Sequence, residues 1–190
     1  FVGFMRFGSP VINCKPRNDL LGNVPNLTTF NKTAIMGFVI VPCQPFGYNY
    51  LGGNLLAGLC CSHVVRERLN KKYDMNLVMF GTTSLYGNTK GASMYDGMKP
   101  MLRYKGNTMS DFIPMMHGKP YHDLAKYVED AIGEPLVPEG ASSRKLKMTT
   151  AIIGLVKKTL EGEDRKTFTS TVANAKNLTE QKRYYVSNYG

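Results

Sequence analysis

Between residues 38 and 108 the chain predicts a strand, a glycine-containing loop, a helix and a second strand, and this order constrains the fold most. Phe38–Pro42 is a short apolar run that ends in proline, and a loop with three glycines follows it. Residues 54–72 predict a helix, and residues 76–80 predict the second strand. A strand that leads into a helix N-terminus directs backbone amides toward one point, so this segment predicts an anion site.

The first part of the chain adds further elements to this α/β (α+β) pattern. Phe1–Phe7 predicts a strand rather than a signal peptide, because Arg6 interrupts its apolar residues. Residues 13–33 are polar and rich in turn-forming types, which indicates a long loop with a functional role. A last strand-like segment covers residues 101–104. We therefore expect residues 1–110 to form an α/β core.

The rest of the chain, residues 111–190, predicts a helical extension that packs on this core. Pro120 favours the first turn of a helix, and Gly133 is typical of the position just past a helix end. Residues 166–172 alternate between polar and apolar side chains, which indicates a late, half-exposed strand. The expected organisation is a core of residues 1–110 followed by this extension.

The charge of the chain is strongly positive and unevenly distributed. The formal net charge is +10, from 24 Lys and Arg against 14 Asp and Glu. Residues 1–110 hold twelve of the cations and four of the acids, whereas residues 111–190 hold twelve and ten. An excess concentrated near the predicted anion site suggests a polyanionic partner, and nucleic acid is the expected one. A solvated basic surface is the alternative interpretation.

The four cysteines indicate a reducing compartment and no metal site. Cys14, Cys43, Cys60 and Cys61 form no CxxC pair and no Cys/His spacing of the kind that binds metals. Unpaired, buried thiols are typical of cytoplasmic proteins. The sequence has no run of about eighteen apolar residues, so no membrane span is expected.

Two groups of side chains after the glycine loop could carry chemistry. Tyr95 could donate a proton to a leaving thiolate, although a packed aromatic residue is the simpler interpretation without further context. Residues 82–88 follow the second strand, where open α/β sheets gather their ligands. Ser84 and Asn88 could orient a substrate there, and an ordinary polar loop is equally consistent. The glycine loop itself lacks both nucleotide-binding fingerprints and, taken alone, is more typical of a plain turn.

Taken together, the order of these elements resembles the core of the GNAT acyltransferases. The resemblance is carried by GFVIVPCQPFGYNYLGGNLLAGLCC at 37–61, NLVMFGTTSLYGN at 76–88 and GASMYDGMKPMLRYKGNT at 91–108. With VGFMRFGSP at 2–10, the set is similar to atypical GNAT-related proteins of phages and mobile elements, which include the Druantia-A-like family and the Mom-type DNA modification enzymes. One departure is that GNAT enzymes place a second small residue two positions after the first loop glycine, where this chain has Asn49.

The resemblance implies a GNAT-like mixed sheet flanked by helices and a donor site for acetyl-CoA or another acyl-CoA. The first strand's backbone would pair with the pantetheine arm of the donor, and the amides of the following loop would hold its pyrophosphate. Tyr95 would be the general acid. The implied donor-binding residues are Ile40, Val41 and Cys43 on the strand, and Gln44, Gly47, Gly52, Gly53 and Asn54 on the loop.

The expected function is that of a phage- or mobile-element-type transferase that modifies a DNA base in the cytoplasm of a bacterial or phage-infected cell. Ser84 and Asn88 would orient the acceptor, and Arg17, Lys99, Arg103 and Lys105 would contact the nucleic acid. Two alternatives stay open. One is a non-catalytic nucleic-acid-binding module that keeps the GNAT-like fold, and the other is an N-acetyltransferase for a small molecule or a protein amine.

Overall fold

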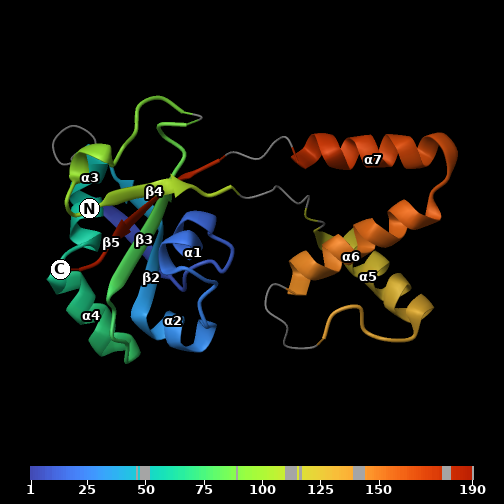
Figure 1. Ribbon diagram of the computed structural model, residues 1–190, viewed down its shortest axis with the longest axis horizontal. Helices are drawn as coiled ribbons and strands as arrows, with labels where there is room; N and C mark the ends of the chain where they lie inside the picture. Colours follow the sequence, from blue (N-terminus) through green and yellow to red (C-terminus); the bar gives the residue numbers. More distant parts are fainter. Residues whose placement is uncertain are drawn as a thin grey trace. The chain divides into compact units, whose positions relative to one another are not determined.

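The computed structural model divides the chain into two compact units, each with its own core (Figure 1). Unit 1 comprises Phe1–Ser110 and Glu180–Gly190, and unit 2 comprises Asp111–Thr179. The structure describes residues 1–45, 47, 52–88, 90–109, 115, 117–138, 144–176 and 181–189.

Unit 1 is built on a five-stranded mixed sheet with the strand order β1-β2-β3-β5-β4. Strands β2 and β3 run parallel, and all other neighbouring pairs run antiparallel. This confirms the predicted α/β class with a mixed sheet. The strands are β1 (Gly3–Gly8), β2 (Ala34–Pro42), β3 (Met79–Ser84), β4 (Arg103–Asn107) and β5 (Arg183–Ser187).

Helices cover both faces of this sheet (Figure 1). One face carries α1 (Lys15–Leu21) and α2 (Leu27–Thr33), and the other carries α3 (Gly52–Cys60) and α4 (His63–Tyr73). The alternation of β5 explains how the two cores form, because successive side chains of a strand point to opposite faces. Tyr185 packs in the core with α3, whereas Tyr184 and Val186 pack in the core near α1 and α2.

Strand β2 leaves its parallel neighbour halfway along its length. Its pairing with β3 begins at Ala34 and ends at Gly37, which faces Thr82. Strand β2 nevertheless continues to Pro42 and stays paired with β1 on its other edge. The second half of β2 therefore has one free edge, and a gap opens between it and the end of β3.

A β-bulge marks the place where the two strands separate. Phe7 of β1 faces Gly37, but Arg6 faces Val39, so Phe38 is an extra residue on β2. A bulge bends the strand that carries it and increases its local twist. This bend explains why β2 turns away from β3 immediately after Gly37.

Two segments of unit 1 differ from their predictions. The predicted helix of residues 54–72 is two helices, because Ser62 ends the first and caps α4 by accepting a hydrogen bond from the Val65 N–H at 3.3 Å. The predicted loop of residues 13–33 contains α1 and α2. Its polar residues act as local helix signals, as where the Asn26 side chain caps α2.

Unit 2 contains α5 (Gly118–Ile132), α6 (Arg144–Thr159) and α7 (Gly162–Lys176). Gly133 ends α5 in the left-handed conformation, as predicted. The predicted strand at residues 166–172 is wrong, because these residues lie inside α7. Its hydroxyls suit a helix: Thr171 Oγ1 donates to the Thr167 carbonyl oxygen at 2.8 Å, one turn earlier.

Helices α5, α6 and α7 all lie after the predicted boundary at residue 110. The end of the chain, which was predicted to belong with them, instead belongs to unit 1. Residues 183–187 return to unit 1 as β5 and pair with β3 and β4. The extension is therefore an insertion between two strands of one sheet. None of the helices that the structure describes has the length and apolar character needed to cross a lipid bilayer.

Candidate functional site

A cavity of about 680 Å³ occupies the gap between the second half of β2 and the end of β3. We call it the wedge cavity. Its volume lies in the range of about 300–1,000 Å³ that is typical of small-molecule sites. Its lining residues are Phe38–Pro42 of β2, Thr82–Tyr86 at the end of β3, Gly47, Gly52, Gly53, Met94, Tyr95 and Lys182.

The free edge of β2 offers one backbone pairing position to this cavity. The Cys43 N–H donates to the Val2 carbonyl oxygen at 2.8 Å, which sets the hydrogen-bonding register between β1 and β2. In an antiparallel pair, hydrogen-bonded and non-hydrogen-bonded residues alternate. Val41 therefore bonds to β1, like Cys43, whereas the N–H and C=O of Ile40 point away from β1 toward the wedge.

This register corrects part of the predicted donor site. The amides of Cys43 and Val41 are directed at β1, so they are not free to pair with a ligand. The N–H and C=O of Ile40 face the wedge, as the predicted pairing with a ligand requires, because the pairing of β2 with β3 has already ended. Val41 still lines the cavity with its side chain.

The loop that follows β2 is partly closed by its own hydrogen bonds. The Gly47 N–H donates to the Cys43 carbonyl oxygen at 2.6 Å. A Cβ at Gly47 would lie 2.7 Å from Pro42 Cβ, so only glycine allows this close approach. The Gly47 amide is therefore occupied, contrary to its predicted role. Residues 46 and 48–51 of the predicted loop lie outside the described residues.

The remaining predicted donor residues divide between the cavity and the surface. Gly52 and Gly53 line the cavity at the start of α3, as a site at a helix N-terminus requires. Gln44 and Asn54 are exposed and are not among the lining residues.

Tyr95 is both a core residue and a lining residue. Only 4% of it is exposed, and its ring packs edge-on against Tyr185 with 5.4 Å between the centroids. Burial raises the pKa of the Tyr95 hydroxyl to about 12. The phenol is thus protonated at neutral pH, which is the state that a proton donor needs.

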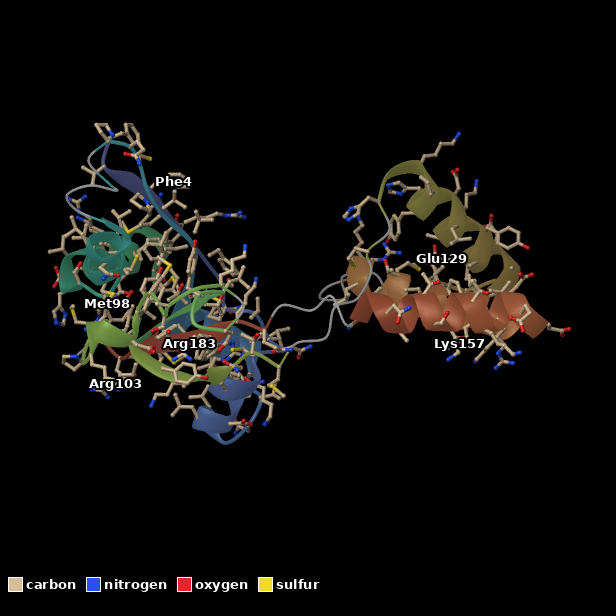
Figure 2. The ribbon with its side chains drawn as sticks, turned by 90° about the horizontal axis from the view of Figure 1, so that it is seen from above. Phe4, Met98, Arg103, Glu129, Lys157 and Arg183 are labelled. Carbon is tan, nitrogen blue, oxygen red and sulfur yellow. The ribbon has the colours of Figure 1, made fainter. Side chains whose placement is uncertain are left out.

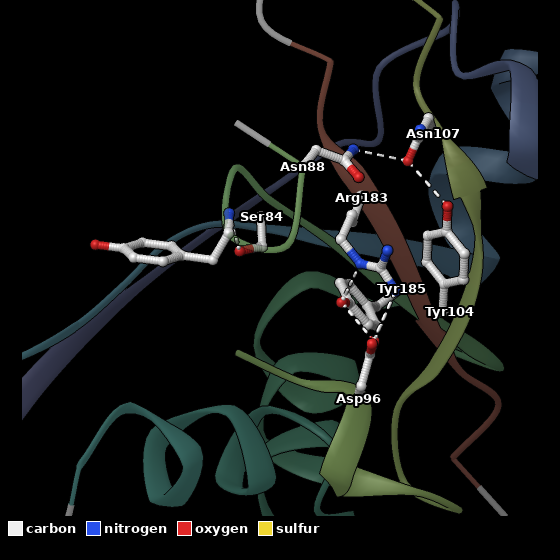
Figure 3. A network of polar contacts seen from close by, with 8 residues as sticks. Ser84, Asn88, Asp96, Tyr104, Asn107, Arg183 and Tyr185 are labelled. Atoms are coloured by element: carbon white, nitrogen blue, oxygen red, sulfur yellow. Dashed lines mark hydrogen bonds and ion pairs between the residues drawn. The ribbon is translucent and has the colours of Figure 1, made fainter. Parts of the chain in front are cut away.

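The structure separates the two residues that were predicted to orient an acceptor. Ser84 is buried and lines the wedge cavity, where its Oγ accepts a hydrogen bond from the Tyr86 N–H at 3.1 Å. Asn88 is exposed and does not line the cavity. Its Nδ2 donates to Asn107 Oδ1 at 2.8 Å and so ties the loop after β3 to β4 (Figure 3).

A polar network that the sequence did not predict lies beside Tyr95 (Figure 3). Arg183 Nη2 donates to both carboxylate oxygens of Asp96, at 2.9 and 3.0 Å, and the Tyr185 hydroxyl donates to Asp96 Oδ1 at 2.8 Å. Hydrogen bonds from Ser93 and Tyr185, together with Arg183, hold the pKa of Asp96 below its usual value. The network connects β5 to the residue next to Tyr95.

Sequence patterns could not have found this network, because 87 positions separate Asp96 from Arg183. The one local sequence feature that pointed to this site was the run of two cations and two tyrosines at residues 182–185. The guanidinium carbon of Arg183 also lies 3.8 Å from the centroid of the Tyr104 ring.

The predicted nucleic-acid contacts have different environments. Arg17 is only 1% exposed, and its guanidinium donates to the carbonyl oxygens of Val11 and Ile12 and lies over the Phe30 ring. Its predicted contact with nucleic acid is therefore wrong, because the side chain is consumed by the core. The other three predicted residues, Lys99, Arg103 and Lys105, are exposed on β4 or just before it.

The charges around the wedge cavity favour an anionic ligand. Lys182 is the one charged side chain among the described lining residues. Unit 1 as a whole holds fourteen Lys and Arg against five Asp and Glu, so it carries +9 of the formal net charge of +10. No family model, curated protein or solved structure matches the chain.

Proposed function

We propose that unit 1 is a GNAT-like transferase that binds an acyl-CoA-type donor in the wedge cavity and passes its acyl group to an amine of a DNA base. The observation that carries this proposal is the separation of β2 from β3 after Gly37, which leaves the Ile40 edge facing a cavity of about 680 Å³. A continuous parallel ladder would leave no such edge.

The donor's shape fits this arrangement. A pantetheine arm is long and thin and carries amide groups, so it can add to an open strand edge as an extended peptide does. Its N–H and C=O groups would pair with those of Ile40. The diphosphate would lie near Gly52 and Gly53 at the start of α3, and Lys182 adds positive charge to the cavity lining.

The proposed reaction needs one proton donor at the leaving sulfur. An amine nitrogen attacks the thioester carbonyl, the C–N bond forms, the C–S bond breaks, and the sulfur leaves with the bonding electron pair. The Tyr95 hydroxyl gives its proton to this thiolate and becomes a phenolate. The attacking nitrogen releases one proton to solvent, and the Tyr95 phenolate takes one proton from solvent, so the proton count balances. With its pKa raised to about 12, Tyr95 is protonated at neutral pH and therefore has a proton to give.

The charge of unit 1 supports nucleic acid as the acceptor. Two of its five acids are already paired, because Asp19 lies 2.7 Å from Lys15 and Asp96 lies 2.9 Å from Arg183. Most of the cations are therefore available to phosphates. An amine on a small molecule or a protein would give no reason for this excess.

Thermal unfolding in the presence of acetyl-CoA tests the donor site. A ligand at about 100 times its Kd stabilises the folded state by about 2.7 kcal/mol, which raises the Tm by several degrees. We expect this shift for the natural chain and for Tyr95→Phe, because the phenylalanine keeps the ring. Only the natural chain should form a modified nucleoside that mass spectrometry detects after expression. No shift at millimolar acetyl-CoA would refute the proposal.

A second candidate is a nucleic-acid-binding module without catalysis. The observation that favours it is that the amides of Cys43 and Gly47 already bond to carbonyl oxygens of the chain, so the described part of the loop offers fewer donors than a diphosphate site uses. Salt-dependent DNA binding together with no acetyl-CoA shift would select this candidate.

A further inference from the structure

Two exposed aromatic rings stand on opposite walls of the wedge cavity. Phe38 lies on β2 and Tyr86 follows β3, and both line the cavity although each is 45% exposed. Phe4 and Val41, which face each other across β1 and β2, are 50% and 38% exposed. Exposed apolar groups that gather beside a cavity mark a binding surface more often than scattered ones do.

The backbone holds both rings in place. Phe38 is the bulged residue of β2, and a Cβ added to Gly8 would lie 3.1 Å from Phe38 Cε2, so the ring lies beside this glycine. The Tyr86 N–H is held by Ser84 Oγ, and the next N–H, that of Gly87, donates to the Lys90 carbonyl oxygen at 3.0 Å. Rings on a fixed backbone lose little freedom on binding, which favours affinity.

The rings accompany a cation rather than acids. Lys182 lines the same cavity, and none of the described lining residues is an acid. Aromatic faces combined with cations are the means by which proteins hold unpaired nucleic acid, because bases stack on the rings and phosphates pair with the cations.

We propose that the mouth of the wedge cavity binds single-stranded DNA, with one base stacked on Phe38, a neighbouring base stacked on Tyr86 and a phosphate paired with Lys182. The choice of DNA as the ligand rests on the proposed function. The new proposal adds that the acceptor DNA is single-stranded. An unpaired base has both faces free to stack, and its amine can enter the wedge without leaving a duplex.

This surface differs from the exposed basic residues Lys99, Arg103 and Lys105, which the sequence predicted as contacts for nucleic acid. Strands β1 and β4 are the opposite edges of the sheet, and Figure 2 shows Phe4 and Arg103 at distant places on unit 1. The basic residues of β4, Arg103 and Lys105, therefore do not form part of the cavity mouth.

Fluorescence anisotropy of the full chain with a labelled oligodeoxycytidylate of about twelve nucleotides, whose bases carry the amine, tests the proposal. Phe38→Leu and Tyr86→Leu keep apolar bulk at exposed positions but remove the stacking face. We expect each to weaken binding about 5- to 100-fold, the range of one lost stacked base. The matched control is Tyr127→Leu, because Tyr127 is 71% exposed on α5 of unit 2, and it should bind like the natural chain.

The salt dependence separates stacking from charge. Lys182→Gln should lower the slope of log K against log salt by about 0.7, the value for one phosphate contact on a single strand. The two leucine variants should keep the slope of the natural chain. The proposal is overturned if both leucine variants bind like the natural chain, if the natural chain does not bind the oligonucleotide, or if it prefers a duplex of the same length.

Acetyl-CoA thermal shifts on the same variants distinguish this proposal from the proposed function. If the leucine variants lose DNA affinity and acetyl-CoA never stabilises the natural chain, the DNA surface stands and the transferase fails. If acetyl-CoA stabilises the natural chain while the leucine variants bind DNA as the natural chain does, the transferase stands and the DNA surface fails.

Discussion

The two halves of β2 belong to one strand but have opposite surroundings. Ala34–Gly37 is buried and paired with β3, and Met36 and Gly37 also pair with β1, whereas Val39–Pro42 pairs with β1 alone and Phe38 and Val41 are exposed. The bulge at Phe38 separates them. The comparison teaches that one apolar run supplies both a segment paired with β3 and an edge that faces the wedge cavity, and that a single extra residue separates the two.

The largest expected difference between the halves is in stability. Ile35 is 5% exposed in the core of unit 1, so Ile35→Ala should reduce the free energy of unfolding by about 2–5 kcal/mol. Val41 is 38% exposed, so Val41→Ala should cost only about 0.5 kcal/mol. Urea unfolding followed by circular dichroism measures both values. Equal costs would contradict the division of β2 into a core half and a surface half.

A smaller effect is expected where the loop closes on the end of β2. In Gly47→Ala the new Cβ would lie 2.7 Å from both Pro42 Cβ and the Val2 carbonyl oxygen, so the free energy of unfolding should fall by about 1–3 kcal/mol. Gly58→Ala is the matched control on α3, because its Cβ would meet only Met98 Cε at 3.9 Å.

The control should be more stable than the natural chain by about 0.5–1 kcal/mol, since alanine suits a helix interior better than glycine. If Gly47→Ala is as stable as the natural chain, the loop does not pack on Pro42 as described.

The sequence predicted the elements of the wedge but not their register. Phe38–Pro42, the start of the helix after the glycine loop and Tyr95 all lie at the cavity, because apolar runs and turn residues report local structure directly. The bulge could not be predicted, because Phe38 stands in an unbroken apolar run. Register, rather than composition, decides that Ile40 faces the wedge while Cys43 bonds to β1.

Tertiary contacts account for the other differences. Arg17 looked like a surface cation, but the carbonyl groups of Val11 and Ile12 and the Phe30 ring make its burial possible. Residues 183–187 were expected outside the core, but pairing with β3 and β4 makes them its fifth strand. Neither partner is visible in a local pattern.

Amide hydrogen exchange at Ile40, followed by NMR with and without acetyl-CoA, tests the central claim most directly. In the free protein the Ile40 amide should exchange faster than those of Val39 and Val41, because the register directs only its N–H into the wedge. Saturating acetyl-CoA should protect the Ile40 amide and leave its neighbours unchanged. An Ile40 amide as protected as its neighbours in the free protein, or one that acetyl-CoA does not protect, would contradict the account.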